Sequence, residues 1–268
     1  MNTKKILAMQ DLSCVGQCSL TVVHPIMSAY GFETCVLPTA VLSNHTMFPK
    51  WSYLDLTPEI ENIYSVWKEV GIKFDAYLLG YLGKASLMAL AEKCFDEFSN
   101  EGRLIVIDPV FADNGKLYGG FDLNYVKDMA NLIRRADIIL PNVTEACFLT
   151  GTEYKTEHTK EYIEVILYKL AELTPAKAVV TGVELDGKIG EAILSDGKVS
   201  YVMGDKIPVS FHGTGDIFAA VFTSHYLAGK GLEKSADLAS VFVQDCIRAT
   251  DKEHFYGVCF EKVLAKNL

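Results

Sequence analysis

The sequence lacks the features of a disulfide-stabilised or membrane-embedded protein. None of its seven cysteines forms a Cys-x-x-Cys pair, and their odd number and irregular spacing are typical of a reduced protein. No stretch approaches the roughly 18 uninterrupted apolar residues of a membrane span. The first apolar run ends at Gln10 and Asp11, which is too early for a signal peptide. We therefore expect a soluble, cytoplasmic protein with no membrane contact.

Basic residues are also too few for a nucleic-acid-binding surface. The chain has 25 Lys and Arg against 34 Asp and Glu, a net charge of −9. A protein that binds nucleic acid needs clustered positive charge, so we expect no nucleic-acid partner. Any anion that binds this protein must be held locally, by a few well-placed groups.

Several motifs that would identify other enzyme classes are missing. No Gly-x-Gly-x-x-Gly follows the first apolar run, and neither His-Arg-Asp nor Asp-Phe-Gly occurs, so a dinucleotide-binding fingerprint and a protein kinase are both excluded. The histidines have no zinc-ligand spacing. The segment 182–189, GVELDGKI, has the glycine and lysine spacing of a P-loop, but Ile189 replaces the required Ser or Thr. Because this segment also leads into alternating residues rather than a helix, we interpret it as a β-turn.

What the sequence does contain is a repeated pattern of short apolar runs and amphipathic stretches. With 268 residues, half of them apolar, it can bury a large core as a single domain over residues 1–268. The alternation predicts an α/β fold with a mostly parallel sheet covered by helices. From residue 188 the pattern changes to two alternating runs around Asp196-Gly197, which predicts a β-hairpin. Two final helices are expected at 214–228 and 232–249. The expected strands are KKILAMQ (4–10), 76–80, 103–110, 136–141 and 176–182, and the expected covering helices are 57–70, 84–99, 122–134 and 157–173.

Polar residues follow almost every expected strand. In an open parallel sheet, ligands bind beyond the carboxyl ends of the strands, so these residues are the candidates for a functional site. They are Asp11, Ser13, Tyr81, Asp108, Asp113, Asn142, Glu145 and Thr181.

The stretch GTGDIFAAVF, residues 213–222, combines two glycines and an acid with the start of an apolar helix. A helix that begins at Thr214 presents free N–H groups and a positive dipole end, and the glycines allow close approach by a ligand. This arrangement is an anion cradle suited to a phosphoryl group. Asp216 would repel the same anion, but an acid at this position makes sense as the base that accepts a proton from an attacking hydroxyl. The alternative interpretation is an ordinary helix cap with an acid in its first turn.

Five sequence blocks together resemble those of a known family. The chain is similar over nearly its whole length to the pyridoxal (vitamin B6) kinases of the ribokinase-like superfamily. The resemblance implies a three-layer α/β/α fold and an ATP-dependent enzyme that phosphorylates the 5′-hydroxymethyl group of pyridoxal, pyridoxine or pyridoxamine. It also implies Mg²⁺, often a monovalent cation such as K⁺, and a homodimer. Five blocks carry it, in the order of the family: VLSNHTMFPKW (41–51), LLGYLGKASL (78–87), VIDPVFADNGKLY (106–118), ADIILPNVTEACFLTG (136–151) and GTGDIFAAVF (213–222).

The resemblance also implies roles for individual residues. Asp216 would be the catalytic base, and Gly213, Thr214 and Gly215 would form the anion hole. The substrate contacts would be Ser13, His45, Thr46 and Tyr81. The nucleotide contacts would be Asp108, Asn142, Thr181 and Thr214, and the residues near the metal would be Asp108, Asp113 and Glu145.

Alternatives remain open at this stage. The segment QDLSCVGQCSL is shorter by about two residues than the family's usual first loop, so Asp11 rather than Ser13 is an alternative substrate contact. Four of the other residues also have a purely structural interpretation. Asp108 would end a strand and Asn142 would cap a helix, whereas His45 would be a buried histidine with all its hydrogen bonds made within the protein and Tyr81 an aromatic residue at the rim of the core. At the level of function, the alternatives are a hydroxymethylpyrimidine kinase of thiamine biosynthesis and a non-catalytic B6-binding carrier or sensor.

Overall fold

The computed structural model describes residues 3–209, 211–251 and 253–267. In this part of the chain, nine strands form one sheet in the order β11-β10-β9-β8-β5-β4-β1-β2-β3. The neighbours from β9 to β2 run parallel, whereas β3, β10 and β11 pair antiparallel. The strands are β1 (Lys5–Ser13), β2 (Glu33–Leu42), β3 (Tyr53–Asp55), β4 (Phe74–Leu79), β5 (Ser99–Ile107), β8 (Ile138–Ile139), β9 (Lys177–Leu185), β10 (Lys188–Ser195) and β11 (Lys198–Asp205). A separate small ribbon pairs β6 (Ala112–Asp113) with β7 (Lys116–Leu117).

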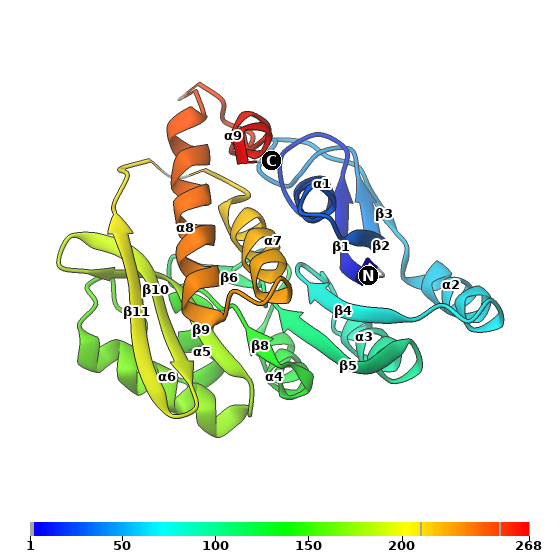
Figure 1. The fold of residues 1–268 in the computed structure, drawn as a ribbon, viewed down its shortest axis with the longest axis horizontal. Coiled ribbons are helices and arrows are strands. Elements are labelled where there is room, and N and C mark those ends of the chain that lie inside the picture. Colours follow the sequence, from blue (N-terminus) through cyan, green and yellow to red (C-terminus); the bar gives the residue numbers. More distant parts are fainter. Residues whose placement is uncertain (1–2, 210, 252, 268) are drawn as a thin grey trace.

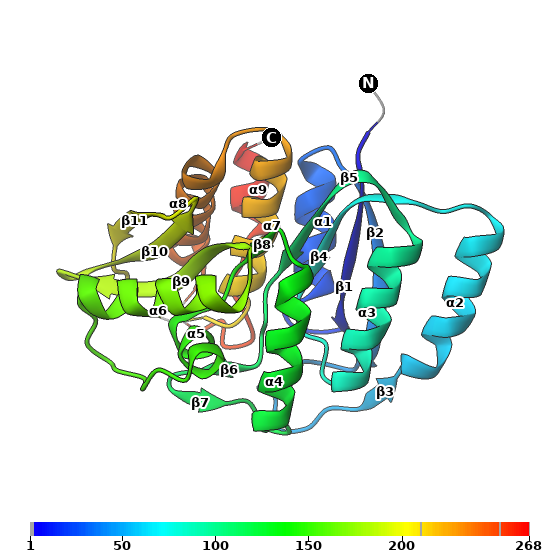
Figure 2. The same ribbon diagram turned by 90° about the horizontal axis from the view of Figure 1, so that it is seen from below.

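Helices cover both faces of the sheet and make three layers (Figures 1 and 2). One layer holds α2 (Thr57–Glu69), α3 (Ala85–Glu97), α4 (Leu123–Leu132), which runs into the 3₁₀ turn η1 (Ile133–Arg135), α5 (Val143–Thr150) and α6 (Lys160–Leu173). The other holds α1 (Leu20–Ala29), α7 (Thr214–Leu227), α8 (Leu232–Ala249) and α9 (Glu261–Asn267). None of the helices in the described ranges is long and apolar enough to cross a bilayer.

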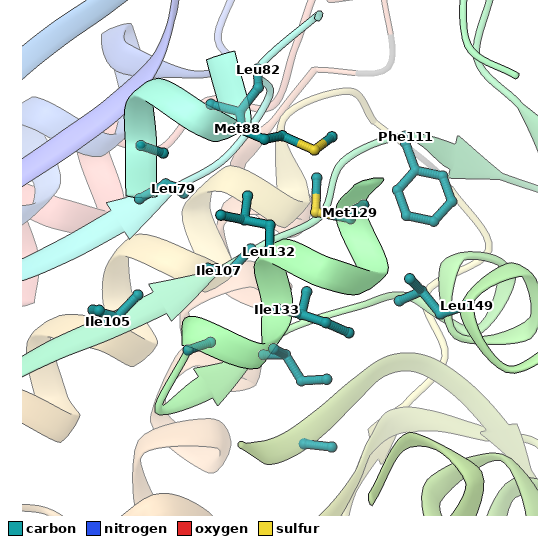
Figure 3. Close-up of a cluster of buried hydrophobic side chains, with 14 of the residues drawn as sticks. Leu79, Leu82, Met88, Ile105, Ile107, Phe111, Met129, Leu132, Ile133 and Leu149 are labelled. Atoms are coloured by element: carbon teal, nitrogen blue, oxygen red, sulfur yellow. The ribbon is translucent and has the colours of Figure 1, made fainter. Parts of the chain in front are cut away.

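The apolar runs of the central strands explain this layering. Along β5, Ile105 and Ile107 face one helical layer and Val106 faces the other, so apolar side chains are required on both sides. Figure 3 shows one of the two cores, where Leu79 and Ile107 of the sheet pack against Met129 and Leu132 of α4. The sheet is therefore buried on both faces, and only its edges and strand ends are open to a ligand.

The sequence-based description of the fold is confirmed, with some differences. The expected α/β architecture with a mostly parallel sheet and a late hairpin is present, and the P-loop-like segment 182–189 forms the β9–β10 turn. The first strand continues to Ser13, past its expected end at Gln10, because it pairs with β2 along this extension. The expectation of only two final helices is wrong, because α9 follows α8 and packs against it.

The strand order places a switch point at β1, which lies between β4 and β2. The chain leaves β1 toward β2 on one side and later returns to β4 on the other. The carboxyl ends of β1 and β4 therefore border a crevice, where ligands bind in folds of this type. Asp11 and Ser13 lie at the end of β1, and Tyr81 follows β4.

Candidate active site

A cavity of about 710 Å³ opens beyond the carboxyl ends of β5, β8 and β9, next to the first turn of α7. It brings together most of the residues expected at the phosphate end of the site, although they come from four different elements. Its lining includes Asp108, Asp113, Asn142, Glu145, Thr181, Gly213, Thr214, Gly215 and Asp216. The strand ends and the glycine-rich helix start therefore meet in one pocket.

The first turn of α7 points free N–H groups into this pocket. Its N-cap, Gly213, has no side chain to accept them, and the first intrahelical bond joins Ile217 N to Gly213 O. The amides of residues 214–216 come before that bond, and within the part of the chain that the structure describes they have no hydrogen-bond partner, so they can bind an anion. Gly213 has φ of 87°, and a Cβ there would lie 1.9 Å from Gln17 O. A Cβ on Gly215 would meet nothing within 4 Å, so the cradle is open on that side.

Asp216 is a half-buried carboxyl in the same turn. Its Oδ2 accepts a hydrogen bond from the backbone N–H of Ser19 at 2.9 Å. The pKa of Asp216 is raised to about 7, mainly because the protein desolvates the carboxyl. The hydrogen bond from Ser19 opposes this rise, and the negative charge of Asp11 adds to it. A carboxyl with such a pKa is ionised for part of the time near neutral pH and is a competent general base.

Ser19 connects Asp216 to the crevice at the end of β1, a connection that the sequence did not reveal. Its hydroxyl donates to Asp11 Oδ1 at 2.5 Å, and the hydroxyl of Ser13 donates to Asp11 Oδ2 at 3.0 Å. Ser19 has φ of 50° and ψ of −134°, a backbone conformation that non-glycine residues rarely adopt. Asp11 and Ser13 thus lie together in one buried group next to the base, and neither excludes the other as a substrate contact.

Asp108 and Glu145 add two buried carboxyls on the opposite side of the pocket. Burial raises the pKa of Asp108, and the charges of Glu145 and Asp216 raise it further. Burial also raises the pKa of Glu145 to about 7, although hydrogen bonds to its carboxylate oppose this shift. Glu145 Oε1 accepts from the N–H groups of Phe111 and Ala112, and Oε2 accepts from the N–H of Asn142. Glu145 therefore fixes the loop that carries the other acids.

Asn142 and Glu145 form a capping box at the start of α5, because Asn142 Oδ1 also accepts from Glu145 N. The side chain of Asn142 thus caps helix α5, as the alternative interpretation of this residue predicted. Asn142 also lines the pocket wall, where a ligand would contact it. Thr181 lies beside it, and its N–H donates to Pro141 O at 2.9 Å. Asp113 is exposed, and its carboxylate accepts two bonds from Asn114.

The expected substrate residues lie outside this pocket, toward the switch point. His45 is buried; its Nε2 donates to Tyr256 O at 2.8 Å, and its Nδ1 accepts from Met47 N at 3.2 Å. Both ring nitrogens are used by the backbone, so neither is left for a ligand. Thr46 is exposed in the adjoining turn, and Tyr81 lies with its ring 5.6 Å from that of Phe121.

His212 joins the two regions and was also missed by the sequence analysis. It lines the pocket, and its ring centroid lies 4.5 Å from that of His45. His212 is partly exposed, but desolvation by the protein atoms around its ring and the neighbouring His45 lower its pKa to about 4, so the ring is neutral at physiological pH. A solitary histidine directly before Gly213 carries no spacing signal that identifies it.

The charges around the pocket favour a ligand that brings positive charge with it. Seven carboxyls and one lysine, Lys206, are among the described lining residues, and Lys206 is paired with Glu184 at 2.7 Å. A polyphosphate would be repelled unless a cation accompanied it. Asp108 is a buried carboxyl of the kind that binds Mg²⁺ as one of only one or two protein ligands, with phosphates and water completing the shell. The described residues contain no ready-made metal cage of three His, Cys, Asp or Glu side chains.

The raised pKa of Asp216 leads to a prediction about stability and pH. The carboxyl has an ordinary pKa of 3.8 in the unfolded chain and one of about 7 in the folded protein. Between these values the folded state holds a proton that the unfolded state releases, so the contribution of Asp216 to stability falls as pH rises. The variant Asp216→Asn cannot titrate. We expect the Tm of this variant minus the Tm of the native chain, both measured by thermal unfolding without ligand, to increase as the pH is raised from about 4.5 to about 7.5. A constant Tm difference would contradict the raised pKa of this group.

Comparison with known proteins agrees with this site. A family model described as phosphomethylpyrimidine kinase matches residues 21–258. The chain therefore belongs to the phosphomethylpyrimidine kinase family, and it is a kinase with the ribokinase-like fold.

Relatives of known assignment point to one branch of these kinases. A Schizosaccharomyces pombe protein assigned as a pyridoxal kinase is 30% identical, with 92% of this chain and 86% of that protein covered. A crystal structure of pyridoxal kinase from Lactobacillus plantarum has a TM-score of 0.92 at 33% identity, covering 99% of this chain and 96% of that one. A Bacteroides thetaiotaomicron structure assigned to the phosphomethylpyrimidine kinases, in a crystal form with pyridoxal, has a TM-score of 0.93 at 39% identity, with the same two shares covered.

Proposed function

We propose that this enzyme transfers the γ-phosphoryl group of ATP to the 5′-hydroxymethyl group of pyridoxal, pyridoxine or pyridoxamine. The observation that carries the proposal is the position of Asp216, a half-buried carboxyl in the open first turn of α7. It has the nucleotide-sized pocket on one side and, through Ser19, the crevice at β1 on the other. The pyridoxal kinase relatives support the substrate class.

These positions favour direct, in-line transfer of the γ-phosphoryl group to the alcohol, without a covalent enzyme intermediate. Asp216 accepts the proton of the 5′-hydroxyl as its oxygen attacks the phosphorus. The amides of residues 214–216 hold the equatorial oxygens of the group in transfer and do not have to reorganise as charge develops. The hydrogen bond from Ser19 fixes one oxygen of Asp216, which leaves Oδ1 to face the alcohol.

ATP with Mg²⁺ fits the acidic pocket. Asp108, Asp113 and Glu145 would lie near the metal. When bound, the ion supplies charge neutralisation for the phosphates. Asn142, Thr181 and Thr214 line the path along which the nucleotide phosphates would run. Because the contacts of Glu145 are all to backbone N–H groups, we assign it to holding the 110–112 loop in place.

The vitamin ring is placed at the switch point. Asp11 and Ser13 would meet its polar substituents, the ring face of His45 and the side chain of Tyr81 would pack on the pyridine, and Thr46 would lie at the rim. The unbroken sheet, which uses strands from Lys5 to Asp205, supports one domain that holds both substrates.

Two other functions compete with this proposal. A hydroxymethylpyrimidine kinase would use the same pocket, because both substrates are flat nitrogen heterocycles with a hydroxymethyl group, and the description of the family model favours it. A B6 carrier without catalysis would have no need of an acid in an anion cradle, so Asp216 argues against it.

A panel of substrates separates the three functions. We expect MgATP-dependent release of ADP with at least one of pyridoxal, pyridoxine and pyridoxamine, in a coupled assay that includes hydroxymethylpyrimidine in parallel. A higher kcat/KM for hydroxymethylpyrimidine than for every B6 vitamer would refute the substrate assignment. Binding of vitamers with no turnover would instead identify a carrier.

A further inference from the structure

A buried carboxyl, Glu191, lines the same pocket as the GTGD turn, and the mechanism does not use it. It is 5% exposed and stands on β10, opposite an irregularity where the pairing with β9 shifts between Gly190 and Ala192. Irregularities of this kind re-aim side chains next to functional sites. Neighbouring residues of the same strand carry apolar side chains into the core, so a carboxyl at this position calls for an explanation.

The contacts of Glu191 do not offset the cost of burying it. Ser240 of α8 donates its hydroxyl to Glu191 Oε2 at 2.6 Å. Among the described residues, the other oxygen, Oε1, has no hydrogen-bond partner, and no lysine or arginine is paired with the side chain. Burial raises the pKa of Glu191 to about 8, and the charge of Asp237 adds to this rise. The group is therefore a neutral acid at physiological pH, with one O–H donor and one fixed acceptor.

The surroundings of Glu191 fit a flat heteroaromatic ring. Ser240, Val243 and Ile247 share one face of α8 and line the pocket, since they are spaced three to four residues apart. The loop before α7 contributes Ile207 and Val209 to the lining. Apolar walls with a buried polar group at one end are typical of sites for planar ligands.

We propose that Glu191 is the residue that selects the nucleobase of the phosphoryl donor, favouring adenine over guanine. This inference rests on the proposed function, because it takes the nucleotide to lie along the pocket with its phosphates at α7. Adenine presents a ring-nitrogen acceptor beside an amino donor, which matches an O–H donor beside a carbonyl acceptor. Guanine presents the reverse order on its corresponding edge.

Ser240 makes the match directional. Because its hydroxyl donates to Oε2, that oxygen is held as the acceptor and Oε1 carries the proton. Without Ser240 the carboxyl would be free to exchange the two roles and to pair with either base. The pair Glu191–Ser240, rather than Glu191 alone, therefore sets the preference.

The test measures binding of MgADP and MgGDP by calorimetry to the full chain and to four variants. We expect the native protein to prefer ADP, and Glu191→Leu and Ser240→Ala to lose about tenfold or more of that preference, since a buried donor–acceptor pair discriminates by this amount. Glu191→Gln keeps the donor and the acceptor in the same order and should retain the preference. Glu233→Gln is the matched control, because it alters a carboxyl that also accepts from a serine hydroxyl, Ser200, but outside the pocket.

The outcomes separate this inference from the kinase proposal. An unchanged ADP-to-GDP ratio in Ser240→Ala and in folded Glu191→Leu would overturn the inference, even with full kinase activity. If Glu191→Leu does not fold, Ser240→Ala decides. A native protein that selects ADP through this pair, yet phosphorylates none of the alcohols, supports the inference and refutes the kinase proposal.

Discussion

Asp216→Asn is expected to lower kcat by about 10²- to 10⁴-fold, the usual contribution of a general base, while MgADP binds as well as before. The amide can still accept the hydrogen bond from Ser19, but it cannot accept the proton of the substrate hydroxyl. Steady-state kinetics with pyridoxal and calorimetry with ADP separate the two effects.

A matched control distinguishes catalysis from helix capping. Glu161 is an exposed acid in the first turn of α6, where it interacts with the helix dipole but lines no pocket. Glu161→Gln should leave kcat unchanged. If Asp216→Asn kept more than half of the native turnover, Asp216 would be an ordinary first-turn acid and the assignment as base would be withdrawn.

Gly213→Ala is expected to destabilise the protein by about 3 kcal/mol and to abolish most of its activity. The added methyl group would lie 1.9 Å from Gln17 O, on a residue that already has positive φ. Strain of the backbone and overpacking each cost about 1–3 kcal/mol. Urea unfolding measures the loss of stability. A native free energy of unfolding in this variant would show that the close approach of Gln17 to the helix start is not required.

Gly215→Ala should show the opposite behaviour, and it serves as the control for Gly213. A methyl group at Gly215 meets no protein atom within 4 Å, so stability should be unchanged or higher by up to about 1 kcal/mol. The same methyl group would narrow the anion cradle, so we expect weaker MgATP binding and slower turnover. Equal loss of stability in both variants would argue against a cradle that is open at Gly215.

Much of the fold could be predicted because local patterns and tertiary structure agree. The central strands are apolar on both faces, and α6 begins at Thr159, whose side chain accepts from Tyr162 N as a cap should. The elements that were not predicted have weaker local signals. Helix α1 is apolar around most of its surface and contains Pro25, whereas β2 contains Pro38, so neither shows a clean period.

Site residues could be predicted where they follow a strand or start a helix. They could not be predicted where their role depends on contacts with residues distant in sequence. Asp108 and Asn142 were found from their positions after β5 and β8. Ser19 was missed because its bond to Asp216 spans 197 positions, and no periodicity encodes such a contact. Glu191 was missed for a related reason, since it lies inside an alternating strand and only the packing of α8 buries it.

The central claim is that Asp216 lies between the alcohol of the substrate and the γ-phosphate. A crystal structure with pyridoxal and a non-hydrolysable ATP analogue tests it most directly. We expect an oxygen of Asp216 within hydrogen-bond distance of the 5′-hydroxyl, and the γ-phosphate against the amides of residues 214–216. A 5′-hydroxyl held by another group, with Asp216 contacting neither ligand, would contradict the account.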